Sequence, residues 1–380
     1  DERYRYCTEA LVRGDGLPEA ERVRSELRDA GGSLIVVRGA DALKVHVHTD
    51  EPESVFERLR AYGRLTARKA EDMKAQHDAI ARAAASHVEL ARRPVAVVAD
   101  TGCDLPDEVV RAHGIRLVPL LLVYDDATLR DRLDIDAAGF VERLRRGEHP
   151  GTSQPSPADF LDVYARAADD AETLVGVTLA AALSGTFASA ETAARRFEGA
   201  DVRLVDSRGA SLLQGLLALR AAELAEAGLD ADAIVRRIAR IRDRSGILFT
   251  VDRLDRLLAS GRITRRQARL GALLGIKPIL ALDREGRVRP AGRAWGRRRL
   301  VPKVMDILAA EIPDGAARVR LGVVHVDCEP VAERVRAALE DRFRPDELIV
   351  APATPVIATH IGRGAWGVAY TVEATPTTTT

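Results

Sequence analysis

The chain has 380 residues, and 57 lysines and arginines are balanced by 57 aspartates and glutamates, so its formal net charge is zero. This balance argues against a protein whose main task is to coat nucleic acid or an anionic membrane, although it is compatible with a local basic pocket. With 46% hydrophobic residues the chain can bury ordinary cores, and its length suggests about two or three domains. We expect a folded globular protein with no nucleic-acid partner and at most peripheral membrane contact.

The apolar stretches are too short to cross a bilayer. The longest are Leu117–Val123 and Gly271–Leu282, the second interrupted by Lys277, and both fall short of the ~18 residues that a span needs. Three cysteines make no disulfide framework, and no signal peptide opens the chain, so we expect a cytoplasmic protein. Because the chain begins at Asp1 rather than at a methionine, we also expect a longer parent protein.

Residues 1–75 alternate between strand and helix patterns. The expected order is strand Arg3–Val12, helix Pro18–Ala30, strands Ser33–Arg38 and Leu43–His48, helix Glu51–Tyr62 and strand Gly63–Lys69. This βαββαβ order is typical of a small ferredoxin-like α+β domain, whose helices cover one face of the sheet. Residues 76–93 are polar and alanine-rich, and they predict a linker helix.

From residue 94 onward the chain again alternates strand and helix patterns, which predicts an α/β protein with a mainly parallel sheet. Its strands are expected at Pro94–Ala99, Leu117–Val123, Thr173–Val177, Val202–Val205, Gly275–Ala281, Arg318–His325, Leu348–Ala351 and Trp366–Val372. A segment of this length exceeds the usual single core, so we expect two lobes, residues 94–244 and 245–373. The low-complexity residues 374–380 are expected to form a disordered tail.

A candidate metal site lies near the start of the chain. His46 and His48 share one face of a strand, because side chains alternate along it. In a ferredoxin-like sheet the first and third strands are neighbours, so Cys7 would face both imidazoles. One thiolate and two imidazoles suit Zn²⁺ and leave a fourth position for water or substrate. In the alternative, Cys7 is a small apolar filler and the histidines are merely solvated.

Four polar loops of the second part carry candidate ligand-binding residues, and three of them also have a purely structural interpretation. They are Asp100–Pro106, Gly151–Pro157, Leu183–Thr186 and Thr359–Ala365. The first follows a strand, where ligand loops of α/β proteins lie, but Asp104 could simply cap a helix. The second holds three hydroxyls and two prolines, and it could bind a small oxyanion or simply begin a helix.

The other two loops also suit an anion. Ser184 and the exposed amides of a helix start make a candidate anion site. The glycines around His360 permit close ligand approach, and its imidazole would be a natural partner for a carboxylate, although a single histidine is more often structural.

Several other chemistries lack support in the sequence. There is no Gly-x-Ser-x-Gly elbow, no P-loop and no Gly-x-Gly-x-x-Gly turn, so neither a serine triad nor nucleotide binding by this segment is indicated. Cys103 beside Asp104 could be a nucleophile, but nothing places a histidine near it. The basic run Arg284–Arg299 with Trp295 is a weak candidate for RNA binding, given the zero net charge.

Taken together, the ordered motifs from Pro94 to Val372 resemble the DegV family, the acyl-binding subunits of bacterial fatty acid kinase, which have a two-lobed α/β fold of the EDD type. The motifs are Asp100–Leu105, Thr152–Ser156, Leu183–Thr186, Asp206–Ser207, Leu254–Leu257, Ser260–Ile263, Gly275–Ile279 and Thr359–His360. The resemblance implies that the chain encloses one long-chain fatty acid.

The resemblance also implies roles for individual residues. It assigns the fatty acid carboxylate to Thr152, Ser153, Ser184 and His360, and the headgroup or phosphate to Arg262 and Arg293. The sequence departs from the family pattern at Ser260, where glycine is usual, at Arg363, where proline is usual, and at Ser211–Gly215, which lacks a common glycine. The first two departures affect the rim of the pocket rather than the ligands.

The N-terminal part resembles the middle domain of the kinase component of the same system, which is a dihydroxyacetone-kinase-like protein. Cys7, His46 and His48 match the zinc ligands of that family, over about Tyr4–His77. In such proteins an ATP-binding DhaL-type domain precedes this segment, so ATP would act only through a domain upstream of this chain. An acyltransferase that accepts acyl phosphate is a further partner implied by the resemblance.

We therefore expect a carrier that binds a long-chain fatty acid and presents its carboxylate for phosphorylation to acyl phosphate, with no catalytic residue of its own. The alternative is a zinc-dependent hydrolase or phosphatase that uses Cys7, His46 and His48. A third hypothesis, a structural interaction module, predicts an empty pocket.

Overall fold

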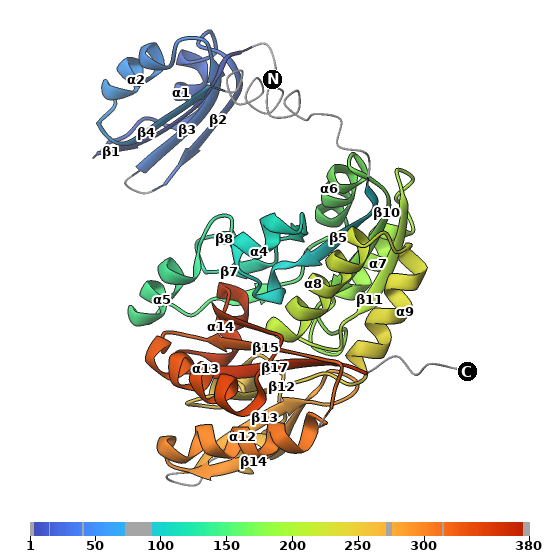
Figure 1. Cartoon of the computed structure of the whole chain (residues 1–380). Coiled ribbons are helices and arrows are strands. Elements are labelled where there is room, and N and C mark those ends of the chain that lie inside the picture. The colour runs from blue at the N-terminus through green and yellow to red at the C-terminus, as the bar shows by residue number, and fades with distance from the viewer. Residues whose placement is uncertain are drawn as a thin grey trace. The chain divides into compact units, whose positions relative to one another are not determined.

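The structure is a computed structural model that describes residues 4–14, 16–39, 42–72, 93–270, 276–313 and 315–374. The chain divides into two compact units, Asp1–Leu90 and Ala91–Thr380 (Figure 1). The linker helix predicted at 76–93 lies outside the described residues except for Arg93, as does the tail beyond residue 374.

The first unit is a four-stranded antiparallel sheet with two helices, in the predicted ferredoxin-like arrangement. Its strands are ordered β2-β3-β1-β4. The elements are β1 (Tyr6–Arg13), α1 (Ala20–Glu26), β2 (Gly32–Arg38), β3 (Ala42–Thr49), α2 (Pro52–Arg60) and β4 (Arg64–Asp72). Alternation along β3 buries Val45 and Val47 in the core with the helices, whereas His46 and His48 point to the other face.

The first half of the second unit holds a four-stranded sheet ordered β11-β10-β5-β6 and a small three-stranded sheet ordered β8-β7-β9. Its elements are β5 (Arg93–Asp100), the 3₁₀ turn η1 (Thr101–Cys103), α4 (Asp107–Ala112), β6 (Arg116–Val118), β7 (Leu121–Val123), β8 (Thr128–Arg130), α5 (Ala137–Arg145), β9 (Gly151–Ser153), α6 (Pro157–Ala168), β10 (Ala171–Thr178), α7 (Thr186–Ala194) and β11 (Asp201–Asp206).

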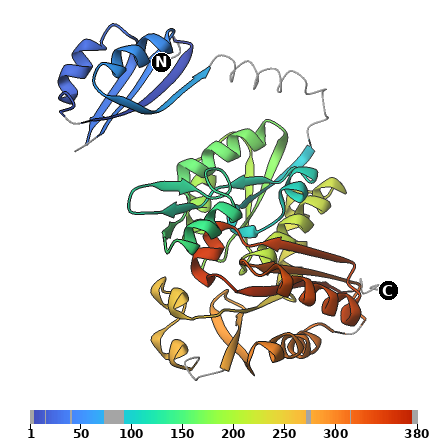
Figure 2. The ribbon, with the colours of Figure 1, turned by 90° about the vertical axis from the view of Figure 1, so that its left-hand side faces the viewer.

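The second half holds a six-stranded sheet ordered β14-β13-β12-β17-β15-β16. Figures 1 and 2 show the two halves next to each other in both views. Helices α8 (Leu212–Glu226) and α9 (Ala231–Arg242) complete the first half. The elements of the second half are β12 (Gly246–Thr250), α10 (Asp255–Ala259), α11 (Arg265–Leu270), β13 (Ile276–Leu282), β14 (Val288–Trp295), η2 (Arg297–Arg299), α12 (Leu300–Glu311), β15 (Arg318–His325), α13 (Glu329–Phe343), β16 (Glu347–Pro352), α14 (Pro355–Ile361) and β17 (Trp366–Glu373).

The prediction of a mainly parallel sheet is right for only one half. The pairs of the four-stranded sheet are parallel. In the six-stranded sheet only β15 and β16 are parallel, and the other pairs are antiparallel. The sequence did not predict the strands β8, β9, β12 and β14, and the arginines of β14 masked its strand pattern. It also joined β6 and β7 into one strand although Pro119 lies between them.

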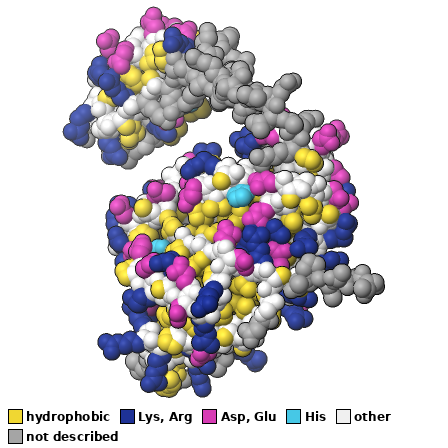
Figure 3. Space-filling model, in the orientation of Figure 1, with side chains coloured by type: hydrophobic (Ala, Val, Ile, Leu, Met, Phe, Trp, Pro, Cys, Tyr) yellow, Lys and Arg dark blue, Asp and Glu magenta, His cyan; other side chains and the backbone are white. Residues whose placement is uncertain are grey.

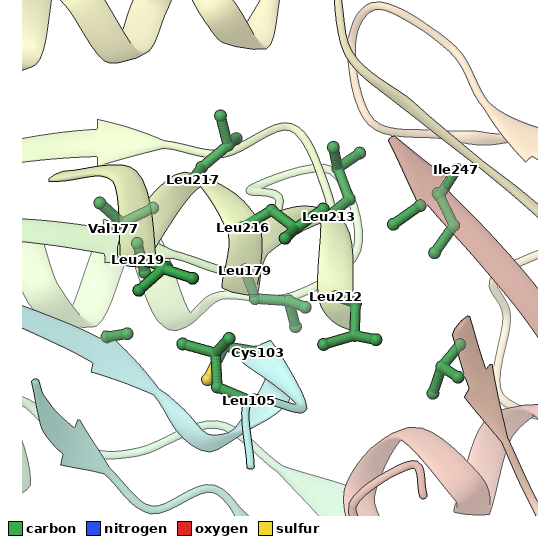
Figure 4. Close-up of a cluster of buried hydrophobic side chains, with 14 of the residues drawn as sticks. Cys103, Leu105, Val177, Leu179, Leu212, Leu213, Leu216, Leu217, Leu219 and Ile247 are labelled. Atoms are coloured by element: carbon green, nitrogen blue, oxygen red, sulfur yellow. The ribbon is translucent and has the colours of Figure 1, made fainter. Parts of the chain in front are cut away.

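Helix α8 forms the centre of the second unit. Twelve of its 15 residues are buried, so the helix is apolar on all sides. It contacts β5 and β10 of the first sheet and β15 and β17 of the second. Figure 4 shows Leu212, Leu213 and Leu216 of this helix among the buried side chains, with Ile247 of β12 nearby.

Two glycines allow this close packing. A Cβ atom at Gly215 would lie 2.4 Å from the carbonyl oxygen of Cys103, and one at Gly322 of β15 would lie 2.9 Å from the Leu212 side chain. Further along the helix, Arg220 forms an ion pair of 2.8 Å with Glu373 of β17. Glycine contacts and an ion pair thus hold α8 against both sheets.

Charge of both signs is interspersed over the face of the second unit that Figure 3 draws. Among the described residues no helix is long and apolar enough to cross a membrane.

Replacing Gly215 by alanine should lower the free energy of unfolding, although alanine favours a helix by about 1 kcal/mol. The added methyl meets backbone rather than a side chain that can move, and such overpacking costs roughly 1–3 kcal/mol. Urea unfolding would measure the change. Gly151→Ala is the control, because its methyl meets nothing closer than 3.9 Å. Equal stability of Gly215→Ala and the wild-type protein would contradict the close contact.

Candidate functional site

A cavity of about 430 Å³ lies in the second unit, between residues of the two halves. Its lining is largely apolar, from Leu179 and Ala210 of the first half to Ile247, Phe249 and Leu282 of the second. The polar lining residues are Thr152, Ser153, Gln154, Ser184, Ser211, Arg262 and His360. The cavity can therefore hold an elongated apolar molecule that carries a polar group.

Local structure fixes the residues of the Thr152 loop. Strand β9 pairs with β7 in a register that sets Thr152 opposite Leu122. After the strand, Ser156 caps α6 in a capping box with Asp159, so the chain turns directly into a helix. Thr152 and Ser153 thus lie on a short strand that is fixed by its pairing with β7 and by the capped start of α6 that follows it.

Asp104 anchors the elements on the other side of the cavity. Its carboxylate accepts hydrogen bonds from the Ser211 hydroxyl (2.6 Å) and from the backbone N–H of Thr354 (2.8 Å). Ser211 precedes α8 and Thr354 precedes α14, the helix that carries His360. The prediction that Asp104 caps the next helix is wrong, since the cap position of α4 is Pro106. Burial raises the pKa of Asp104 to about 6.

His360 and Thr152 meet in the cavity although they are far apart in the sequence. The His360 Nε2 atom lies 3.0 Å from the Thr152 Oγ1 atom. Burial, and then the nearby charge of Arg262, lowers the pKa of His360 to about 3. The imidazole is therefore neutral at pH 7. Its Nδ1 atom is buried without a hydrogen-bond partner among the described residues, which leaves it available to a ligand.

Arg262 supplies the positive charge of the cavity. Its guanidinium is half-buried and donates a hydrogen bond to the carbonyl of Ser260. No carboxylate among the described residues forms an ion pair with it, and burial lowers its pKa. A buried cation without an anionic partner is costly, so this position favours a ligand that brings a negative charge.

Ser184 lies at the start of α7. Its hydroxyl lies 2.8 Å from the Thr186 hydroxyl, and it accepts a hydrogen bond from the Thr186 N–H at 3.3 Å. Between them, Gly185 permits a close approach, since a Cβ atom there would lie 2.0 Å from the Gln154 Oε1 atom. The hydroxyls of β9 and of the α7 start therefore line the same cavity.

Five of the six residues predicted for the headgroup line this cavity, namely Thr152, Ser153, Ser184, Arg262 and His360. The structure places the sixth, Arg293, elsewhere. It is exposed on β14 and lines a neighbouring cavity of about 330 Å³ together with Ile263 and Gln267. The sequence did not reveal the apolar lining residues, because they look like any other core residue.

Cys103 is unsuited to nucleophilic chemistry. It is fully buried, and burial raises the pKa of its thiol to about 12. The sequence-based idea of a cysteine nucleophile therefore finds no support.

Comparison with known proteins assigns the second unit. Residues 94–373 match the family described as "uncharacterised protein, DegV family". The chain belongs to the DegV family. A DegV domain-containing protein of Deinococcus radiodurans is 37% identical over 277 residues, which cover 72% of this chain and 97% of that protein. Residues 3–80 match a second family, the FakA-like middle domain of fatty acid kinase.

Solved DegV structures have the same fold. A DegV family protein from Thermus thermophilus, described as binding fatty acid, superposes with a TM-score of 0.69 at 35% identity, covering 73% of this chain and 99% of that one. DegV of Bacillus subtilis, described as a fatty acid binding protein, gives a TM-score of 0.68 at 29% identity, covering 74% and 100%.

The predicted metal ligands of the first unit lie on the neighbouring strands β1 and β3. In the β1–β3 register Cys7 stands opposite His48, and Glu9 stands opposite His46. The two imidazole rings are 5.1 Å apart, and the His46 Nδ1 atom lies 3.3 Å from a Glu9 carboxylate oxygen. The side chain of Cys7 lies outside the described part. Within that part, no group of three or more His, Cys, Asp or Glu residues could hold a metal ion.

His360 should make the ligand-free protein less stable in acid. Below about pH 6.5 the unfolded chain takes up a proton on this imidazole, whereas the folded protein does so only near pH 3. The free energy of unfolding should therefore fall as the pH drops through this window. Urea unfolding at about pH 7.5 and at about pH 5 would measure this decrease in the free energy of unfolding. The decrease should be smaller in His360→Gln than in the wild type.

His113→Gln serves as the control, because His113 lies near the surface beside Glu226. If His360→Gln and wild type lose the same stability between the two pH values, the imidazole is not held neutral by burial.

Proposed function

We propose that the second unit binds a long-chain fatty acid and presents its carboxylate for phosphorylation to acyl phosphate, as the carrier part of a fatty acid kinase fusion. The observation that carries this proposal is a mainly apolar cavity in which Arg262 lacks an acidic partner among the described residues and His360 is neutral. The fatty acid binding described for the Thermus and Bacillus relatives supports it.

The energetics favour an acyl chain in this cavity. Burial of about 14 methylenes would contribute roughly 11 kcal/mol before the costs of ordering are subtracted. The carboxylate would accept hydrogen bonds from the hydroxyls of Ser153 and Ser184. The Thr152–His360 pair would donate one more: if Thr152 donates to the His360 Nε2 atom, the Nδ1–H of His360 donates to the carboxylate, and if the Nε2–H donates to Thr152, the Thr152 hydroxyl does. Arg262 would then balance the charge, so that no anion is buried unpaired.

In the proposed reaction a carboxylate oxygen attacks the γ-phosphorus of ATP. The bond to the β–γ bridging oxygen breaks, which gives acyl phosphate and ADP. ATP would come with a DhaL-type domain that precedes this segment, and the match of residues 3–80 to a kinase middle domain supports such a context. Arg262 would offset charge on the transferred phosphoryl group, and Arg293 from the neighbouring cavity would be a second candidate. An acyltransferase would then consume the acyl phosphate.

Zinc in the first unit belongs to the same proposal. The residue types suit the ion: Cys7 stands opposite His48 in the β1–β3 register, His46 lies on the same strand as His48, and burial lowers the pKa of His48, which favours the neutral ligand form. Cys7, His46 and His48 would hold the metal, which would stabilise this face of the sheet.

Gently purified protein should release a long-chain fatty acid in denaturing mass spectrometry. Ser184→Ala and Thr152→Val should each weaken palmitate or oleate binding about tenfold, the loss expected when one hydrogen bond to a charged group is removed. Thr192→Ala, on α7 but outside the cavity lining, is the matched control. A protein that releases no fatty acid and binds neither palmitate nor oleate would overturn the proposal.

Metal analysis of the purified protein should find about one zinc per chain, lost in Cys7→Ser and in His46→Gln/His48→Gln. Chelation should leave fatty acid binding intact, because the ligand cavity lies in the other unit. A hydrolase or phosphatase activity that chelation abolishes would favour the alternative function. If the wild-type protein binds no zinc, the zinc part of the proposal is wrong.

A further inference from the structure

A second large cavity adjoins the first. Its volume is about 620 Å³, and Ile247 and Leu282 line both spaces. These two side chains therefore stand between the apolar cavity and the second one. The headgroup residues Thr152, Ser184, Arg262 and His360 are not part of its lining.

Both halves of the second unit build this cavity. The first half supplies Ser207 and Arg208 after β11, together with Arg242 at the end of α9 and the residues just after it, and the second half supplies the β13–β14 turn. That turn packs tightly on the first half: a Cβ atom at Gly286, which has a φ of +83°, would lie 2.7 Å from the Ala180 side chain and 3.2 Å from the carbonyl oxygen of Arg208. The walls are thus held in place.

The lining is rich in arginine. Five arginines line the cavity, against three carboxylates; they are Arg208, Arg242, Arg244, Arg284 and Arg289. Such a lining is unsuited to an acyl tail, because apolar groups gain nothing from contact with charged groups and their water. It is suited to an anion, since guanidinium groups bind phosphate and carboxylate oxygens in pairs.

The three carboxylates leave part of this positive charge uncompensated. Asp243 lies 3.4 Å from the Arg242 guanidinium and 3.5 Å from that of Arg208. Asp283 accepts two backbone hydrogen bonds within its own turn. Glu311 accepts a hydrogen bond of 2.6 Å from the Tyr370 hydroxyl and lies 3.6 Å from the Arg289 guanidinium.

Arg244 and Arg284 are the cations that remain. Both line the cavity from opposite halves, and neither forms an ion pair with another described residue. Two uncompensated charges match a phosphate monoester, which carries about −1.5 to −2 at pH 7. The cavity volume also lies within the ~300–1,000 Å³ range of small-molecule sites.

We propose that this arginine-lined cavity binds a phosphate dianion, either free or as the phosphate group of a small molecule, at Arg244 and Arg284. The site is separate from the fatty acid site and does not depend on the proposed kinase function. A ligand there would lie against Ile247 and Leu282, the residues that also line the apolar cavity.

Calorimetric titration of the full chain at low salt tests the proposal, with inorganic phosphate, pyrophosphate and AMP as probes. We expect saturable binding of at least one probe, and their order of affinity distinguishes a free ion from the phosphate of a larger molecule. The double variant Arg244→Ala/Arg284→Ala should lower the affinity at least about tenfold, as the loss of charge-assisted hydrogen bonds predicts. Both side chains are exposed, so the variant should keep the wild-type melting temperature.

The matched control is Arg236→Ala/Arg240→Ala, which removes the same charge from exposed positions of α9 outside the cavity. This control and Arg262→Ala should both bind the phosphate probes with wild-type affinity. Arg244→Ala/Arg284→Ala should still bind fatty acid. Three outcomes would overturn the proposal. The wild type could show no saturable binding of any probe, or the matched control could lose as much affinity for the probe as Arg244→Ala/Arg284→Ala does. The third is that Arg262→Ala loses affinity for the probe and Arg244→Ala/Arg284→Ala does not.

Discussion

The packing of helix α8 between the two sheets is the constraint on which the ligand cavity depends. The helix can lie this close only because Gly215 faces the Cys103 carbonyl and Gly322 faces Leu212. The two residues just before it, Ala210 and Ser211, line the cavity. A shift of α8 would therefore displace this part of the cavity lining and change the relative positions of the loops that line the cavity.

Asp104 connects this helix to the chemistry of the site. One carboxylate binds both the residue before α8 and the residue before α14, and α14 carries His360. His360 then lies 3.0 Å from Thr152, which is 208 positions away in the sequence. The buried Asp104 carboxylate thus joins the segment before α8 to the segment before the helix that carries His360.

The two cavities on either side of Ile247 and Leu282 differ in chemistry. The first is apolar, and its cation Arg262 has no acidic partner among the described residues, whereas the second is lined by arginines from both halves. The apolar cavity favours a tail that ends in one acidic group, and the arginine-lined cavity favours a compact anion. The zero net charge of the whole chain reveals neither preference, because a sum over all residues does not show where the charges lie.

The sequence by itself determined the order of the elements in the first unit, the shared face of His46 and His48, and the loops that hold Thr152, Ser184 and His360. These features depend on local periodicity and on turn residues, which a sequence displays directly. Only the tertiary structure decided that the six-stranded sheet is mainly antiparallel, that Arg293 lines a different cavity from Arg262, and that Asp104 anchors two helices. The reason is that each of these depends on contacts between distant segments, and those contacts follow from how α8 packs between the sheets.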